Sequence, residues 1–89
     1  MSFHDNAGAR RYELEIEGHT SFAEYLDGGA SRMIMHVETP EAARGRGHAE
    51  KLMRAIVEDA RATGAKLTPR CSYAVAYFRR NKDAADVLA

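Results

Sequence analysis

Near the N-terminus, apolar and polar residues alternate with a period of two, which is typical of strands with one buried face. Residues 11–17 alternate strictly and place Tyr12, Leu14 and Ile16 on the same side, so we predict a half-buried strand there. The residues before it, 1–9, are mostly small or polar, and we expect them to form a loose lead-in.

Two further strands are predicted over residues 20–26 and 31–38. In the first of these, we expect Phe22 and either Ala23 or Tyr25 to face the core. The Asp-Gly-Gly-Ala sequence between the two segments is a strong hairpin signal. The three strands are therefore predicted to form an antiparallel meander.

From Gly47 or His48 to Thr63, the apolar spacing changes to that of an amphipathic helix. Gly64 follows at the position where a glycine commonly ends a helix. The predicted apolar stripe of this helix consists of Ala49, Leu52, Met53, Ile56 and Ala60.

A short fourth strand is predicted over residues 65–71, parallel to the third because a helix crosses between them. Ser72 is then predicted to N-cap a second helix that runs to about Lys82, with a short helical tail over 83–89. We therefore predict an α+β fold in the order βββαβα. Its sheet is mostly antiparallel, with one parallel βαβ unit and two helices.

The composition narrows the class of protein further. A chain of 89 residues with 45% hydrophobic residues predicts one small domain, 1–89, with a modest core. Thirteen basic and thirteen acidic residues cancel, which argues against a general nucleic-acid or membrane-surface binder. One cysteine cannot form an internal disulfide, and no apolar run approaches membrane length. We expect a cytoplasmic protein that is a monomer or a weak dimer.

The most informative motif is the Arg-Gly-Arg-Gly turn at 44–47, between the third strand and the first helix. Glycines let backbone N–H groups approach an anion closely, and a helix N-terminus adds partial positive charge. The turn lacks the Gly-Lys-Ser/Thr of a P-loop and the third glycine of a dinucleotide fingerprint. The pattern predicts a phosphate site, and the alternative is an ordinary connection with solvated arginines.

The segment from Arg44 to Ala49 also matches the Arg/Gln-x-x-Gly-x-Gly/Ala signature of the GCN5-related N-acetyltransferases, abbreviated GNAT. Three further segments, 36–40, 66–73 and 76–81, resemble the small stand-alone GNAT-like family. The resemblance implies a minimal GNAT-like core. It lacks the additional strands and helices that shape the acceptor pocket of a full GNAT domain.

The resemblance implies a protein that binds acetyl-CoA and transfers the acetyl group to an amine acceptor, either a small molecule or a protein. In the superfamily, backbone amides of the Gly-rich loop bind the pyrophosphate of coenzyme A. The cofactor-binding residues expected here are Val37, Thr39, Arg44, Gly45, Arg46, Gly47, His48, Ala49, Ser72, Tyr77 and Arg80.

Cys71 is the most specific candidate for a catalytic group. It stands between a predicted strand and a predicted helix, beside Arg70, and both a helix N-terminus and a guanidinium favour a thiolate. The resemblance places a cysteine here close to the acetyl thioester, where it would accept the acetyl group or assist proton transfer. The alternative is a buried thiol that acts as a small hydrophobic residue.

Tyr77 is the second candidate. The resemblance implies a tyrosine on this helix that protonates the departing CoA thiolate, and Tyr77-x-x-x-Asn81 stands where the superfamily has Tyr-x-x-x-Gly. Tyr73, Tyr77, Arg80 and Asn81 share one helical face, so Arg80 is expected to reach a cofactor phosphate. The alternative is a core tyrosine and a solvated arginine.

His36 and Glu38 are candidate general bases for the acceptor amine. We expect them to share a strand face with Ile34 and Arg32, and the alternative is an ordinary polar strand face. The histidines have no zinc spacing, so no metal is predicted.

Two other functions compete with acetyl transfer. One is a module that holds CoA or acetyl-CoA without efficient catalysis, because the acceptor-pocket elements are missing. The other is an RNA- or protein-binding domain that uses the arginines, which the neutral net charge disfavours.

Overall fold

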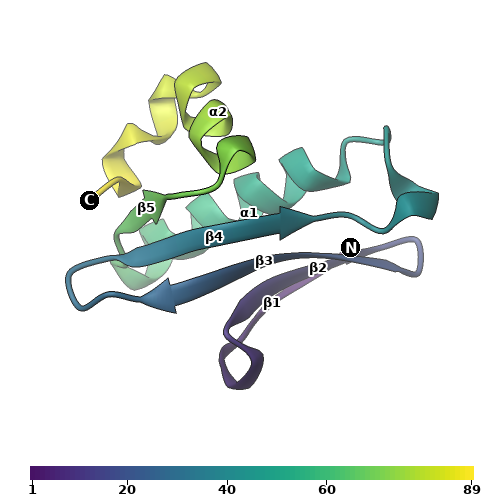
Figure 1. The fold of residues 1–89 in the computed structure, drawn as a ribbon, viewed down its shortest axis with the longest axis horizontal. Coiled ribbons are helices and arrows are strands. Elements are labelled where there is room, and N and C mark those ends of the chain that lie inside the picture. Colours follow the sequence, from purple (N-terminus) through teal and green to yellow (C-terminus); the bar gives the residue numbers. More distant parts are fainter.

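The computed structural model describes residues 1–89 and contains one mixed sheet of five strands. The strands lie side by side in their order along the chain (Figure 1). They are β1 (Ser2–Asn6), β2 (Arg11–Ile16), β3 (His19–Asp27), β4 (Arg32–Glu38) and β5 (Leu67–Pro69). The first four are antiparallel and β4 runs parallel to β5, which confirms the predicted α+β fold.

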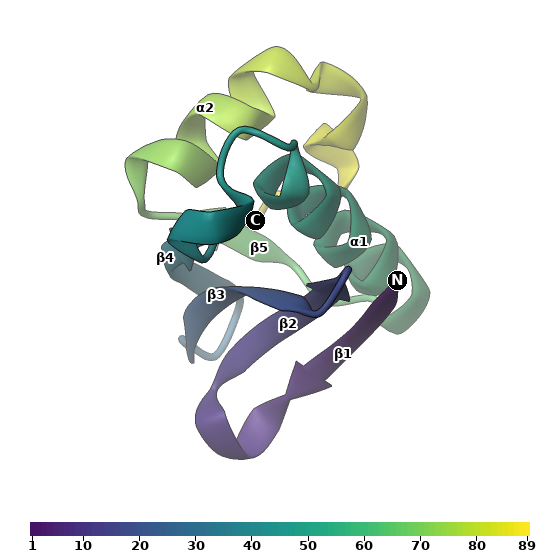
Figure 2. The same ribbon diagram turned by 90° about the vertical axis from the view of Figure 1, so that its right-hand side faces the viewer.

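Two α-helices, α1 (His48–Thr63) and α2 (Ser72–Arg80), lie on the same side of the sheet and leave its other face uncovered (Figure 2). Short 3₁₀ helices are η1 (Ala7–Ala9), η2 (Glu41–Ala43) and η3 (Lys82–Val87). The predicted first helix is confirmed, including its end at Gly64, whose φ is 80°. None of the helices combines the length and the apolar character that a membrane crossing requires.

The first nine residues are not the loose lead-in that we expected. β1 pairs with β2 along its whole length, and η1 forms the connection. His4 Nε2 lies 2.8 Å from Glu13 Oε1, and Asp5 Oδ2 lies 2.8 Å from Arg32 Nη1. Only one apolar residue of this strand, Phe3, packs against the core. Residues 1–9 are therefore ordered by backbone pairing and ion pairs, and the spacing of apolar residues in the sequence does not indicate either of these.

The predicted core face of β2 is confirmed, because Tyr12 and Leu14 are buried. In β3 the buried residues are Ser21, Ala23 and Tyr25. The expectation that Phe22 faces the core is wrong. Its ring lies on the uncovered face, where the Arg11 guanidinium carbon sits 4.3 Å from the ring centroid. The Phe22 ring is therefore covered by the Arg11 side chain and does not pack in the core.

β4 contains a bulge at Met35. Adjacent residues of β3 pair with Ile34 and His36, so the residue between them has no partner. An extra residue reverses the alternation of faces along a strand. Ile34 therefore points into the core, whereas His36 and Glu38 lie on the uncovered face. The expectation that these two residues share a face with Ile34 is wrong for this reason.

β5 is shorter than predicted, and the entry into α2 differs by one residue. Cys71 is the N-cap of α2, not Ser72. Cys71 has an extended backbone (φ −90°, ψ 154°), and its Sγ accepts a hydrogen bond from Ala74 N at 3.4 Å. Ser72 is already helical and its side chain is exposed. The helix ends at Arg80, before the predicted end at Lys82.

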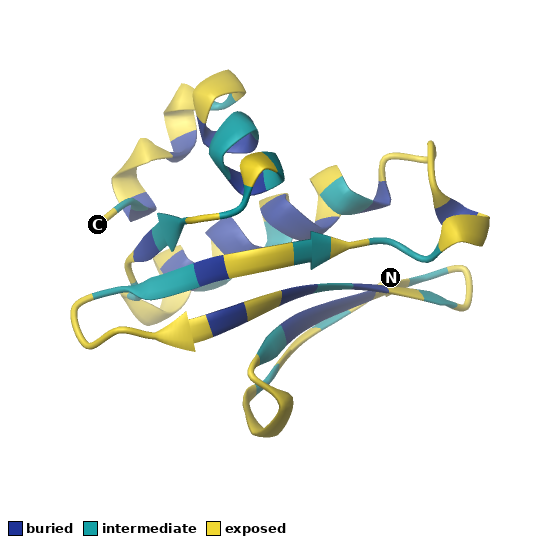
Figure 3. Cartoon of the chain, in the orientation of Figure 1, coloured by how far each residue is buried: buried dark blue, intermediate teal, exposed yellow.

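A cluster of 16 buried residues from the sheet, both helices and η3 forms the hydrophobic core (Figure 3). The residues that α1 buries in it are Leu52, Met53, Ile56, Val57 and Ala60. The predicted stripe is therefore confirmed except at Ala49, which is only partly buried. Val87 of the predicted tail docks on the core as well.

Candidate functional site

β4 and β5 separate at one end of the sheet. Their pairing covers only three residues of each strand. Ile34 O then accepts hydrogen bonds from Arg70 N (2.9 Å) and Cys71 N (3.3 Å), and the edge of β4 from Met35 onwards has no β5 partner. We call the opening between residues 35–38 and the start of α2 the β4–β5 split. Crevices at the carboxyl ends of parallel strands are common ligand sites.

The loop from β4 to α1 presents backbone N–H groups at this end of the sheet. Gly45 and Gly47 have φ values of 84° and 77°, in the left-handed region that favours glycine. α1 begins at His48, and no side chain caps its N-terminus. The N–H groups of a first helical turn have no partner within the helix, so this end attracts anions.

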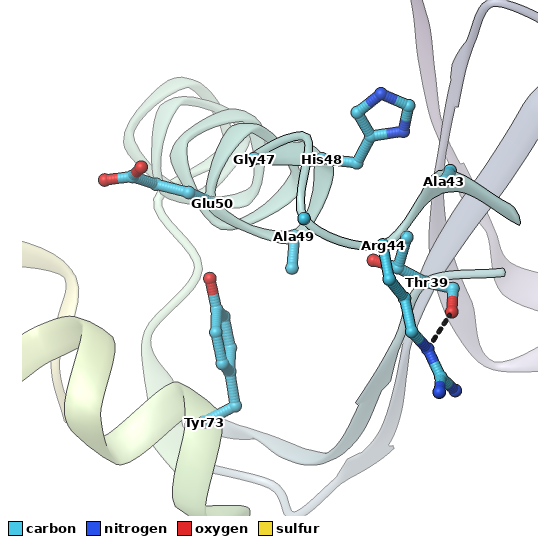
Figure 4. Close-up of a pocket in the computed structure, with 9 residues that line it drawn as sticks. Thr39, Ala43, Arg44, Gly47, His48, Ala49, Glu50 and Tyr73 are labelled. Atoms are coloured by element: carbon cyan, nitrogen blue, oxygen red, sulfur yellow. Dashed lines mark hydrogen bonds between the residues drawn. The ribbon is translucent and has the colours of Figure 1, made fainter. Parts of the chain in front are cut away.

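This loop borders a cavity of about 300 Å³ (Figure 4). The remaining walls come from the first turn of α1 and from Tyr73 on α2, whose hydroxyl points toward α1. The lining residues are Thr39, Ala43, Arg44, Gly45, Gly47, His48, Ala49, Glu50 and Tyr73. Six of the predicted cofactor-binding residues are thus brought together, namely Thr39, Arg44, Gly45, Gly47, His48 and Ala49.

The two arginines of the loop have different surroundings. Arg44 lines the cavity, and its Nε donates to Thr39 O at 3.3 Å. Arg46 lies outside the cavity, and its Nη1 is 3.7 Å from Glu17 Oε1 in the β2–β3 turn. Only Arg44 is therefore placed to add its charge to the cavity directly.

The imidazole of His48 is a feature that the sequence did not indicate. Its side chain is 2% exposed, and its Nε2 lies 3.8 Å from Glu17 Oε1. Its Nδ1 is the one buried side-chain nitrogen or oxygen without a hydrogen-bond partner. The motif accounts for the backbone N–H of this histidine, and no signal in the sequence pattern indicates that its ring is enclosed.

The sequence model of the GCN5-related N-acetyl-transferase family matches residues 11–87, from β2 to the end of η3. The chain belongs to this family. The match confirms the resemblance noted in the sequence, and the five-stranded sheet with its parallel β4–β5 pair is consistent with a minimal GNAT core. A search of curated proteins finds no match.

The two tyrosines of α2 occupy different places in this GNAT domain. Tyr77 is 4% exposed and packs edge-on against Phe78 at 5.5 Å, away from the cavity. Burial raises the pKa of Tyr77, and the charge of Arg54 opposes this rise. Tyr73 lines the cavity, where burial raises its pKa and the charge of Arg80 opposes it. Arg80 is thus close to Tyr73 on α2, although it does not line the cavity.

The remaining candidates lie outside the cavity. Cys71 is partly buried beside the β4–β5 split, with its sulfur at the start of α2. Val37 is partly buried against the core, and Ser72 is exposed.

His36 and Glu38 lie on the uncovered face, and the side chain of each is about half exposed. His36 Nε2 lies 2.9 Å from Glu38 Oε1. No group of three or more His, Cys, Asp or Glu side chains is arranged to hold a metal ion.

Proposed function

We propose that this GNAT domain binds acetyl-CoA at the β4–β5 split and transfers the acetyl group to an amine. The observation that carries the proposal is the uncapped N-terminus of α1, which opens into a cavity beside two left-handed glycines. Backbone N–H groups, the helix dipole and the Arg44 guanidinium together suit the diphosphate of CoA.

The glycines fit this role in two ways. A Cβ on Gly45 or Gly47 would meet no atom within 4 Å, so a side chain there would enter space that an anion needs. Their positive φ values also disfavour any other residue. Tyr73 lines the same cavity from α2, and Arg80, which lies close to Tyr73, would reach a phosphate from that side.

The free edge of β4 fits the amide-containing arm of CoA. An extended chain with amide groups can pair with an unpartnered strand edge as an added strand. Val37 and Thr39 would contribute backbone groups, because the Val37 side chain packs on the core and the Thr39 hydroxyl accepts a hydrogen bond from Ser21.

Acetyl-CoA supplies the acetyl group as an activated thioester. In direct transfer, the amine nitrogen forms the new C–N bond, the thioester C–S bond breaks, the amine loses a proton and the CoA sulfur gains one. Glu38 or His36 would accept the amine proton. A tyrosine hydroxyl of α2 would donate a proton to the sulfur. Tyr73 and Tyr77 are both protonated at neutral pH, and burial raises the pKa of each, so either would give up its proton only to a strong base such as the departing thiolate.

A covalent route through Cys71 is the second form of the same reaction. The Cys71 sulfur would take the acetyl group and release CoA as its thiol, and the amine would then take the acetyl group and restore the Cys71 thiol. The position of Sγ at the N-terminus of α2, next to the split, supports this route.

The alternative function is binding of CoA or acetyl-CoA without efficient turnover. One observation favours it: His36 and Glu38 lie on the uncovered face and bind each other, whereas the cavity lies on the helical side. A proton acceptor on the far side of the sheet serves the reaction only if the acceptor amine approaches from that side.

Titration calorimetry with acetyl-CoA, followed by acetyl transfer to a panel of amines, tests the proposal. We expect binding, turnover with at least one amine, and faster alkylation of Cys71 by iodoacetamide than of an unperturbed thiol, with protection by acetyl-CoA. If acetyl-CoA binds and no amine is acetylated, the binding-module alternative holds. If the folded protein does not bind acetyl-CoA, both acetyl transfer and the binding-module alternative are excluded. Equal turnover by Cys71→Ala would exclude the covalent route alone.

A further inference from the structure

A groove of about 350 Å³ crosses the uncovered face of the sheet, apart from the loop cavity. Its lining residues are Ala9, Arg10, Glu24, Tyr25, Leu26 and Met35. Leu26 and Met35 are each 42% exposed, and Met1 is the only other large hydrophobic residue that is exposed. The sheet therefore presents two apolar side chains to water in one place, and an aliphatic ligand would cover them.

The groove touches the β4–β5 split at Met35. Met35, which forms one wall, is the bulge residue that directly follows Ile34. Ile34 O is the acceptor for Arg70 N and Cys71 N, so it marks the point at which β5 departs from β4. The groove therefore borders this opening at Met35, and the loop cavity lies next to it through Thr39 and Tyr73. His36 and Glu38 lie on the groove side of that opening.

Two unpaired charges mark the rest of the groove. Arg10 and Glu24 both line it, and neither forms an ion pair within the protein. Arg10 directly precedes β2, and its carbonyl oxygen accepts a hydrogen bond from Tyr25 N at 2.9 Å. β3 lies between β2 and β4, so Arg10 and Met35 are two strand spacings apart, about 10 Å.

We propose that this groove binds the acceptor and that the acceptor is an amino acid whose reacting amine ends an unbranched aliphatic stem. The carboxylate binds the guanidinium of Arg10, the stem lies on Leu26 and Met35, and the amine reaches the split beside His36. Glu24, in the middle of the groove, adds affinity for an α-ammonium group, so lysine is preferred to an ω-amino acid of the same length. This inference rests on the proposed acetyl transfer, and it adds the class of acceptor.

Kinetics with matched amines test the acceptor class. We expect kcat/KM to rise about two- to fourfold for each methylene from glycine through 4-aminobutyrate to 6-aminohexanoate, because each methylene covers apolar surface. Hexylamine, which lacks the carboxylate, is expected to have a several-fold higher KM than 6-aminohexanoate with a similar kcat. Nα-acetyl-lysine amide, which represents a lysine within a protein, is expected to resemble hexylamine. Equal kcat/KM for all these amines would overturn the inference and leave acetyl transfer intact.

Single substitutions test whether the groove residues themselves bind the acceptor. Arg10→Gln is expected to remove the difference between 6-aminohexanoate and hexylamine, and Met35→Ser to flatten the dependence on stem length. Arg79→Gln is the matched control, because Arg79 is an exposed arginine on α2 without an ion pair. If Arg79→Gln has the effect of Arg10→Gln, the carboxylate is attracted by overall charge, and the groove assignment is wrong.

A binding measurement keeps the inference testable without turnover. The methyl resonance of Met35, assigned by its loss in Met35→Leu, is expected to shift saturably with 6-aminohexanoate and less with hexylamine. The shift is expected to weaken in Arg10→Gln and to persist in Arg79→Gln. A Met35 methyl that does not respond to millimolar 6-aminohexanoate, in a protein that binds acetyl-CoA, would exclude the groove as the acceptor site while leaving the cofactor site in place.

Discussion

The two ends of β4 differ in how fully their polar groups are satisfied. At its start, Arg32 donates to Asp5, Asp27 and the Tyr12 hydroxyl, and its guanidinium lies 4.1 Å from the centre of the Tyr25 ring. At its end, the strand edge is free, α1 is uncapped, and His48 Nδ1 has no partner. Satisfied polar networks fix a structure, and unsatisfied groups have capacity left for a ligand. We therefore expect the first end to contribute mainly to stability and the second, under the proposed function, to ligand binding.

The largest effect is expected from Arg32→Met, which tests the satisfied end. The substitution leaves the partly buried Asp5 carboxylate with only the Tyr25 hydroxyl as a donor and no positive charge beside it, and we expect a loss of about 2–4 kcal/mol in the free energy of unfolding. Urea denaturation measures this loss. The affinity of the folded protein for acetyl-CoA should not change, and a parallel loss of affinity would contradict the division between the two ends.

The next largest effect is expected from Gly47→Val, which tests the open end. We expect at least a tenfold loss of acetyl-CoA affinity, because the side chain enters the cavity and valine strains a backbone at φ 77°. Gly64→Val is the control, since Gly64 has φ 80° and equally free surroundings at the other end of α1. Both variants should lose about 1–2 kcal/mol of stability, and only Gly47→Val should lose affinity in calorimetry.

A smaller effect is expected within the loop itself. Arg44 lines the cavity, whereas Arg46 faces Glu17, so Arg44→Gln should weaken acetyl-CoA binding about three- to fivefold and Arg46→Gln less. Added salt should reduce the difference between wild type and Arg44→Gln, because the contribution is that of an exposed charge. If Arg46→Gln has the larger effect, the arginines exchange places when the ligand binds.

The smallest effect concerns Glu13 on the uncovered face. Hydrogen bonds from Arg11 and Asn6 lower the pKa of Glu13, and burial opposes them. In the unfolded chain the pKa of Glu13 is 4.5, so below pH 4.5 the unfolded chain binds more protons than the native protein. The stability that ionised Glu13 contributes is therefore complete above pH 4.5, and it is lost as the pH falls through the pKa of Glu13 in the folded protein. Urea unfolding from about pH 3 to 6 should show a weaker pH dependence for Glu13→Gln. An unchanged dependence would assign the acid sensitivity to other carboxylates.

The elements that depend on regular spacing were predictable from the sequence. α1 follows from its apolar stripe and from Gly64, and the glycine-rich loop before it follows from the turn between a strand and a helix. The parallel pairing of β5 with β4 follows from the helix between them, since a parallel pair needs a crossover.

The features that depend on tertiary contacts were not predictable. β1 has no alternating pattern, and it is ordered by backbone pairing with β2 and by ion pairs with Glu13 and Arg32. Tyr73 lines the cavity in the place where Tyr77 was expected to contribute, because the packing of α2 on the core decides which of the two is enclosed. The same limit applies to the His48 ring, whose burial depends on the β2–β3 turn.

The bulge at Met35 makes the two faces of the sheet depend on a single residue. Deleting Met35 would remove the bulge and leave the faces unchanged, because adjacent residues of β3 already pair with Ile34 and His36. If Met35 instead stayed in the strand as an ordinary paired residue, the part of β4 beyond Ile34 would turn over. Val37 would then point to solvent, and the polar side chains of His36 and Glu38 would point under α1. A natural variant one residue shorter here should therefore keep the proposed acceptor face, whereas a variant of the same length without the bulge would lose it. In an alignment of relatives, a one-residue gap at Met35 is thus compatible with the same two faces and should be placed before residue types are compared.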